Sequence, residues 1–367
     1  LLAATPASAS LTPVRPSPES LYVGARAAAL AGDARRSAQL YATLVRAQPD
    51  NSLIASQAMT QAIMAGDMRL ALSLARSRPA AQLGVETWLA LAGDELARGR
   101  PETAERWLTQ RSDGPDLSFL LPVIRGWRAA QANDTEGALR HLGSVPAQGS
   151  LSPFVAEQQA FILLRGRRLA DAAPLVQQAL ASAQGRERRL RIGFADAYVR
   201  AGAREEALEL LSGADPVITA ARQRIERGDR LDTAITSPAE AFAELLLAFA
   251  IDLNRQENRD LPIAMAQVAR HTDPSNAEAA IILGMLLGAE GRGDDSVAVL
   301  RSVPESSPFA IQARDAEIRT LITGDRGQEA LARAQAWAAN EGSAEDWARV
   351  GDVLDNLDRH VDAAAAY

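Results

Sequence analysis

Helical stretches rich in apolar residues run along most of the chain, and short turns interrupt them at nearly constant intervals. The predicted turns lie at Gly32, Gly66, Gly99, Asn133, Gly166, Gly202, Glu257, Gly291, Gly324 and Asp358. Consecutive turns are almost evenly spaced along the sequence, except for one longer spacing between Gly202 and Glu257. A period of about 34 residues is typical of solenoids built from helix–turn–helix units. The pattern matches this period and therefore predicts about ten such units.

Most of the predicted turns share two local features. Gly and Asn tolerate the left-handed backbone that ends a helix. A small residue follows each turn but one by five or six positions: Ala38, Ala71, Ala104, Ala138, Ala172, Ala207, Ser296, Ala330 and Ala363. A small side chain there lets the two helices of a pair approach closely, whereas a bulky one should push them apart.

Three of the predicted units have similar residues at several further corresponding positions. The third has Trp88, Leu91, Ala92, Gly99, Ala104 and Leu108; the eighth has Leu283, Gly284, Leu287, Gly291, Ser296 and Leu300; the last has Trp347, Val350, Gly351, Leu354, Ala363 and Tyr367. In this pattern the chain resembles the tetratricopeptide repeat (TPR) family over roughly residues 18–367. The resemblance implies an all-α, right-handed superhelix. It also implies a concave face, lined mostly by the first helix of each pair, that holds a peptide or protein segment.

The one long step, from Gly202 to Glu257, exceeds the common period by more than half a repeat, which indicates an inserted segment. The predicted organisation is a disordered leader or signal-peptide remnant over residues 1–17, six repeats over 18–212, an inserted helix and extended segment over 213–236, and four repeats over 237–367, the last one truncated. Pro216 to Arg227 could form the extra helix. The insertion either bridges two halves of the solenoid or docks a partner. Ser237 to Glu240 form a capping box that starts the next helix.

Composition narrows the possible functions. All 39 basic residues are Arg, the chain has no Cys, and the formal net charge is −7. Net acidity argues against a nucleic-acid partner, which needs a basic stripe. The absence of Cys excludes disulfides, thiol catalysis and Cys-ligated zinc. The absence of Lys excludes a Schiff base. No apolar stretch of about 18 residues is present, so we expect no transmembrane span.

The sequence nominates no catalytic, cofactor-binding or metal-binding residue. Its three histidines, His141, His271 and His360, fall in units four, seven and ten. A metal site needs ligands that converge on one point, and these are far apart in a linear stack. The common catalytic and phosphate-binding motifs are absent. We therefore expect a non-catalytic protein without a cofactor.

The helical register places a set of side chains on the predicted concave face: Tyr22, Arg26, Ser56, Thr60, Val123, Trp127, Ile192, Asp196, Ile281, Met285, Arg314 and Ile318. The candidate partner-binding residues among them are Tyr22, Arg26, Trp127, Met285 and Arg314. Exposed aromatic and Met side chains often anchor partners, so Trp127 and Met285 are of most interest. The alternative is that both belong to the core.

Two features bear on location. Residues 1–10 are small and apolar, and Ala7 to Ala9 resemble a signal-peptidase site, which predicts export; a plain disordered leader is the alternative. The insertion with Ser237 to Glu240 and Leu245 to Ala248 resembles a family of long bacterial envelope repeat proteins. Some members are outer-membrane lipoproteins that present cell-wall hydrolases to a carboxyl-terminal processing protease. The resemblance implies a periplasmic or outer-membrane-associated adaptor whose partners include such a protease and its substrates.

Alternatives remain open at this point. A cytoplasmic assembly or regulatory solenoid would have the same repeats, and lipid anchoring has no support because no Cys is present. Because the chain starts at Leu1 and not at Met, we expect it to be either a fragment or a processed form. Because it stops inside an apolar helix, we expect the natural protein to continue beyond Tyr367.

Overall fold

The computed structural model describes residues 16–109, 116–183, 185–254, 260–340 and 342–367. Within these ranges the protein is all-helical, without a strand, which confirms the predicted fold class. The first six helix pairs are α1 (Pro18–Leu30), α2 (Ala34–Ala47), α3 (Ser52–Met64), α4 (Met68–Arg76), α5 (Val85–Ala97), α6 (Pro101–Thr109), α7 (Leu121–Gln131), α8 (Thr135–Gly143), α9 (Val155–Arg165), α10 (Leu169–Ala181), α11 (Glu187–Ala201) and α12 (Arg204–Leu210).

A single helix, α13 (Pro216–Arg227), follows these pairs, at the position of the predicted insertion. Four further pairs complete the chain: α14 (Pro238–Leu253), α15 (Asp260–Thr272), α16 (Ala277–Ala289), α17 (Gly293–Leu300), α18 (Ala310–Thr323), α19 (Gly327–Asn340), α20 (Ala344–Asn356) and α21 (His360–Ala366). Short 3-10 turns, η1 (Ala80–Gln82), η2 (Ser118–Leu120) and η3 (Ser152–Phe154), lie in the connections.

The turns within the pairs have the expected backbone. Gly32 and Gly66 adopt φ values of 77° and 74°, and the Asp residue after each accepts a hydrogen bond from the first turn of the next helix. In units five and nine the left-handed residue comes one position later than predicted, at Arg167 (φ 58°) and Asp325 (φ 56°). The turn predicted at Glu257 lies outside the described residues.

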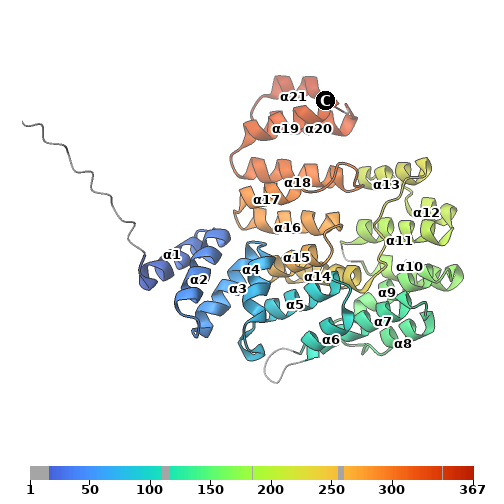
Figure 1. Ribbon diagram of the computed structural model, residues 1–367. Coiled ribbons are helices and arrows are strands. Elements are labelled where there is room, and N and C mark those ends of the chain that lie inside the picture. Colours follow the sequence, from blue (N-terminus) through green and yellow to red (C-terminus); the bar gives the residue numbers. More distant parts are fainter. Residues whose placement is uncertain (1–15, 110–115, 184, 255–259, 341) are drawn as a thin grey trace, which may run out of the picture.

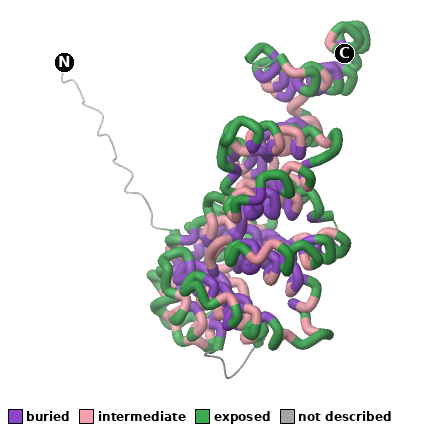
Figure 2. Tube along the Cα trace, turned by 90° about the vertical axis from the view of Figure 1, so that its right-hand side faces the viewer, coloured by how far each residue is buried: buried purple, intermediate pink, exposed green. Residues whose placement is uncertain are grey.

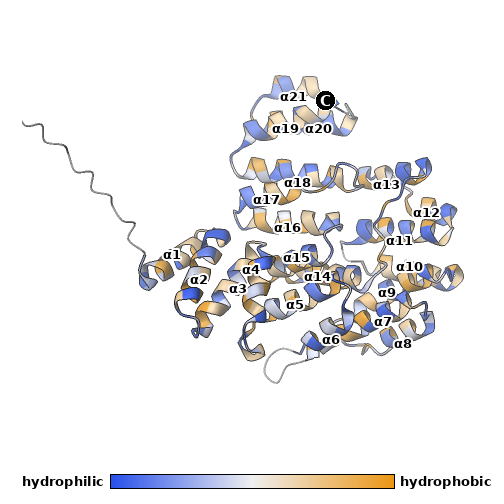
Figure 3. Cartoon of the chain, in the orientation of Figure 1, coloured by the Kyte–Doolittle hydropathy of each residue, from blue (hydrophilic) through white to orange (hydrophobic). Residues whose placement is uncertain are grey.

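The small residues after the turns are all buried between the two helices of their pairs. Ser296 is the only polar one, and its hydroxyl donates to Gly284 O at 2.7 Å. Figure 3 shows hydrophobic and hydrophilic residues alternating along the helices, as expected for helices with one buried and one exposed face.

The seventh helix pair departs from a linear stack. After α13 the chain returns through residues 228–237, and α14 and α15 lie against α3, α5 and α7 of the first six pairs. All eight residues from Ala241 to Ala248 are buried, more than two full turns, so α14 is surrounded on every side. The pairs from α16 to α21 then stack onward from this central hairpin.

Three groups of buried residues form the core. The largest extends from α2 to α18 and includes the central hairpin. A smaller group holds α1, α2 and α3 together. A separate group around Trp337 joins the helices from α17 to α21. Figure 2 shows buried residues running through the stacked layers, with exposed residues at the outer turns.

Candidate protein-binding surface

The inner face of the first array is occupied by the protein's own central hairpin. Trp127 on α7 is 0% exposed, and its indole Nε1 donates to Gln158 Oε1 at 2.6 Å. Nearby, Phe249 of α14 makes edge-to-face contacts with Phe119 and Phe154, with ring centroids 6.1 and 5.6 Å away. Trp127 therefore has no side-chain surface to offer a partner in this structure, in agreement with the alternative that placed it in the core.

Close backbone packing brings α5 against the hairpin. A Cβ added at Gly93 would lie under 3.0 Å from Thr272 Oγ1 and 3.3 Å from Val268 Cγ1, both on α15. The next residue, Asp94, contacts His271 Nε2 at 3.0 Å and pairs with Arg76. Burial alone would raise the pKa of Asp94, but the hydrogen bonds from His271 and Arg76 lower it below its ordinary value.

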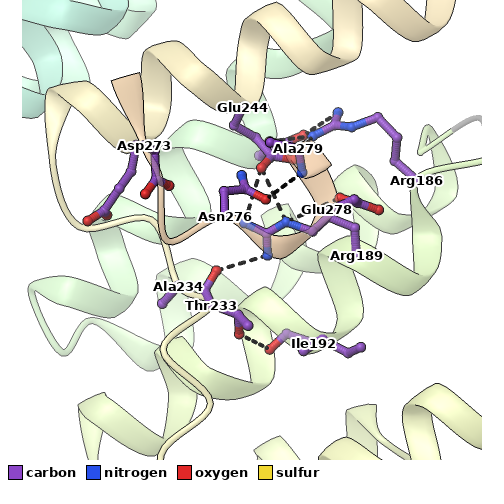
Figure 4. Close-up of polar contacts among 12 residues, drawn as sticks. Arg186, Arg189, Ile192, Thr233, Ala234, Glu244, Asp273, Asn276, Glu278 and Ala279 are labelled. Carbon is purple, nitrogen blue, oxygen red and sulfur yellow. Dashed lines mark hydrogen bonds and ion pairs between the residues drawn. The ribbon is translucent and has the colours of Figure 1, made fainter. Parts of the chain in front are cut away.

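A buried cluster of charges joins the hairpin to the other side of the array. Arg186 pairs with Glu157 on α9 at 3.0 Å and with Glu244 on α14 at 2.6 Å. Arg189 on α11 pairs with Glu244 at 3.1 Å and with Glu278 on α16 at 3.4 Å. Figure 4 shows the two arginines reaching toward Glu244 and Glu278. The cluster links four helices that lie far apart in the sequence.

The cluster contains three carboxylates and two guanidinium groups, so its charges do not balance when all are ionised. Burial raises the pKa of Glu157. Burial, helped by the neighbouring Glu244, raises the pKa of Glu278 to about 7. For Glu244 burial acts in the same direction, but Arg189 and Arg186 outweigh it and lower its pKa. The cluster therefore has one carboxyl more than it has guanidinium groups, and burial favours the protonated form of both Glu157 and Glu278.

The extended part of the insertion is tied into the same region. Asp196 Oδ2 accepts hydrogen bonds from the backbone N–H groups of Thr233 and Ala234 at 2.8 and 2.9 Å. Arg189 Nη1 donates to Thr233 O at 2.9 Å. A polar cavity of about 390 Å³ lies beside this segment. These hydrogen bonds therefore fix Thr233 and Ala234 against α11 of the first array.

A cleft between the insertion and the second array remains open. It has a volume of about 340 Å³ and is lined by Arg188 of α11, by two residues of α13, by Met285 of α16 and by five residues of α18: Arg188, Pro216, Val217, Met285, Ile311, Gln312, Asp315, Ala316 and Arg319. Met285 is 48% exposed. Its exposed thioether makes this cleft the strongest candidate for a binding surface.

The other sequence-predicted residues lie elsewhere. Tyr22 is 40% exposed on α1, edge-on to Tyr41 at 6.2 Å, and Arg26 is exposed on the same helix. Arg314 is only 7% exposed, pairs with Glu305 and Asp346, and lies over the Trp337 ring at 5.3 Å. Among the five candidates, only Met285 lines the cleft, while Tyr22 and Arg26 keep exposed surface on the first helix.

The remaining positions assigned to the concave face are largely inaccessible. Ser56 and Thr60 are half-buried, and the others are buried: Val123, Ile192, Asp196, Ile281 and Ile318. Sequence reasoning missed the cleft residues on α13 and α18. Gln312, Asp315 and Arg319 are spaced so that they lie on one face of a helix. This spacing is the sequence pattern that could have indicated the α18 wall of the cleft.

The described ranges contain neither a cluster of metal-ligating side chains nor a helix that could span a membrane. They contain no group of three or more His, Asp or Glu side chains placed to hold a metal ion. No described helix has both the length and the apolar character needed to cross a membrane.

Comparison with known proteins finds similar solved structures, three of which are described below. No protein-family model matches the sequence, and no curated protein matches it. The tetratricopeptide domain of P58(IPK) is 13% identical, with 93% of this chain and 98% of that chain covered and a TM-score of 0.26. A Naa15/Naa10 structure bound to HypK-THB is 14% identical, with 95% and 64% covered and a TM-score of 0.32. Yeast Tom70 is 10% identical, with 95% and 90% covered and a TM-score of 0.28. These TM-scores are below 0.5 and carry no conclusion about function.

Proposed function

We propose that the protein is a non-catalytic scaffold or adaptor that binds partner proteins through the cleft around Met285. The observation that carries the proposal is the contrast between the two arrays. The inner face of the first array is filled by α14 and α15, whereas the second array keeps an open cleft with an exposed thioether at its wall. Met side chains adapt to irregular apolar surfaces, and they are frequent at protein-binding sites.

We further propose that the protein acts in the bacterial envelope, in the periplasm or at the outer membrane. The support comes from sequence: the signal-like residues Ala7 to Ala9 and the resemblance of the segment around Ser237 to Glu240 to envelope repeat proteins. On this proposal the partners are a carboxyl-terminal processing protease and the cell-wall hydrolases presented to it.

Site-specific photo-crosslinking in the source cells tests both proposals. A photoreactive amino acid replaces Met285 in the full-length protein, and a matched chain carries it at Leu30, which is also well exposed. Crosslinked proteins are identified by mass spectrometry. We expect envelope proteins at Met285 and none of them at Leu30. Recovery of cytoplasmic assembly factors alone would overturn the location, and an absence of crosslinks at Met285 would overturn the binding role of the cleft.

A further inference from the structure

Five of the nine side chains that line the Met285 cleft are apolar, and the other four are polar or charged. Pro216 and Val217 contribute from α13, and Ile311 and Ala316 contribute from α18, opposite Met285 of α16. A volume of about 340 Å³ is at the lower end of the range for ligand pockets, roughly 300–1,000 Å³. A space of this size suits one or two side chains of an extended segment and is too small for a whole helix.

The charges around the cleft leave an excess of one cation. Arg188 pairs with Asp215 through two contacts of 2.6 and 3.0 Å. Asp315 pairs with Arg349 at 2.7 Å. Arg319 is exposed and makes no ion pair with any described side chain. With both carboxylates already neutralised, Arg319 is the group free to bind an anion from outside.

We infer that the cleft binds an extended peptide segment with an aliphatic side chain next to a carboxylate. The aliphatic group packs against Met285, Val217 and Ile311. The carboxylate pairs with Arg319. This inference rests on the proposed binding role of the cleft and specifies the chemistry of its partner.

Selection from random short peptides displayed on phage tests the inference, with the whole chain immobilised. We expect enriched sequences that combine Leu, Ile, Val or Met with a neighbouring Asp or Glu. A synthetic peptide of the enriched sequence is then titrated against the protein, with binding measured by fluorescence anisotropy. We expect about fivefold weaker binding for Arg319→Gln, little change for Arg319→Lys, and about tenfold weaker binding for Met285→Ala.

A control variant and a methyl-signal measurement test whether the peptide binds at the cleft. Arg35→Gln removes another exposed arginine without an ion pair among the described residues, and it should bind like the unchanged chain. Because only five methionines are present, their ¹³C-labelled methyl signals can be followed separately, and the peptide should shift the Met285 signal most.

The experiments distinguish a failure of the assigned peptide chemistry from a failure of the proposed function. Enrichment of basic peptides, no enrichment, or affinity unaffected by Arg319→Gln and Met285→Ala would overturn the assigned peptide chemistry, even if photo-crosslinking at Met285 still recovers a partner. A Met285 methyl shift that depends on protein concentration alone would show a second copy in the cleft and would also overturn it. Loss of both crosslinking and peptide binding would overturn the proposed function itself.

Discussion

Glu278 should make the stability of the protein fall as the pH rises from 4.5 to about 7. Its side chain is only 13% exposed, 3.4 Å from Arg189, and faces the carboxylate of Glu244. Its pKa is raised from 4.5 to about 7 by burial and by Glu244. Between these pH values the folded chain keeps a proton that the unfolded chain has released, so the free energy of unfolding decreases with rising pH.

The size of the effect follows from the two pKa values. Each pKa unit corresponds to about 1.4 kcal/mol, so the complete shift is worth about 3 kcal/mol above pH 7. In Glu278→Gln the neutral amide replaces the protonated carboxyl at almost the same size. We expect the variant to be more stable than the unchanged chain by about 1 kcal/mol at pH 5.5 and by about 3 kcal/mol at pH 8.

Urea unfolding followed by circular dichroism measures this difference at both pH values. Because repeat arrays can unfold in segments, amide hydrogen exchange in α14 and α16, compared between the two chains at equal pH, provides a local measurement. Glu209→Gln, at an exposed position on α12, is the matched control and should show no such change. A stability difference between Glu278→Gln and the unchanged chain that is the same at pH 5.5 and pH 8 would refute the reasoning.

Three further substitutions test the packing. Gly93→Ala forces a Cβ into Thr272 Oγ1 and should cost about 1–3 kcal/mol, whereas Gly143→Ala, in open space, should cost nothing in the same thermal unfolding assay. Asp94→Asn removes a buried carboxylate with a lowered pKa, so it should cost about 1–3 kcal/mol at neutral pH. That loss should shrink as the pH falls below 4, since protonation then removes the same charge from the unchanged chain. Trp337→Ala should lower the free energy of unfolding by about 3–5 kcal/mol. Because Trp337 belongs to a separate core, amide hydrogen exchange should become faster only in α17–α21. An equal acceleration of exchange in α5 would contradict this prediction.

The repeat units were predictable because their signals are local. A left-handed Gly, a small residue half a dozen positions later, and a capping residue such as Ser237 act within one helix pair. Each signal concerns contacts between neighbours in the sequence. Their spacing therefore indicated the number of helix pairs and the position of the insertion without any knowledge of the rest of the chain.

The return of the central hairpin was not predictable in the same way. The apolar run from Ala241 to Ala248 indicates that α14 is buried on all sides, but burial does not identify the covering helices. The contacts that do so, such as Gly93 with Thr272, join residues from the third and the seventh repeat. For the same reason, the register could place Trp127 on the inner face of α7 but could not tell that α14 packs against that helix.

The buried charges also explain how the cleft keeps its shape. A buried ion cluster adds little stability over apolar residues of equal size, but it restricts how its helices can meet. On α11, Arg189 joins the cluster while the preceding residue, Arg188, lines the cleft. On α16, Glu278 joins the cluster and Met285 lies two helical turns further on. The same pairings that hold the hairpin in the first array thus set the distance between two walls of the cleft, so the filled groove and the open one are parts of one arrangement.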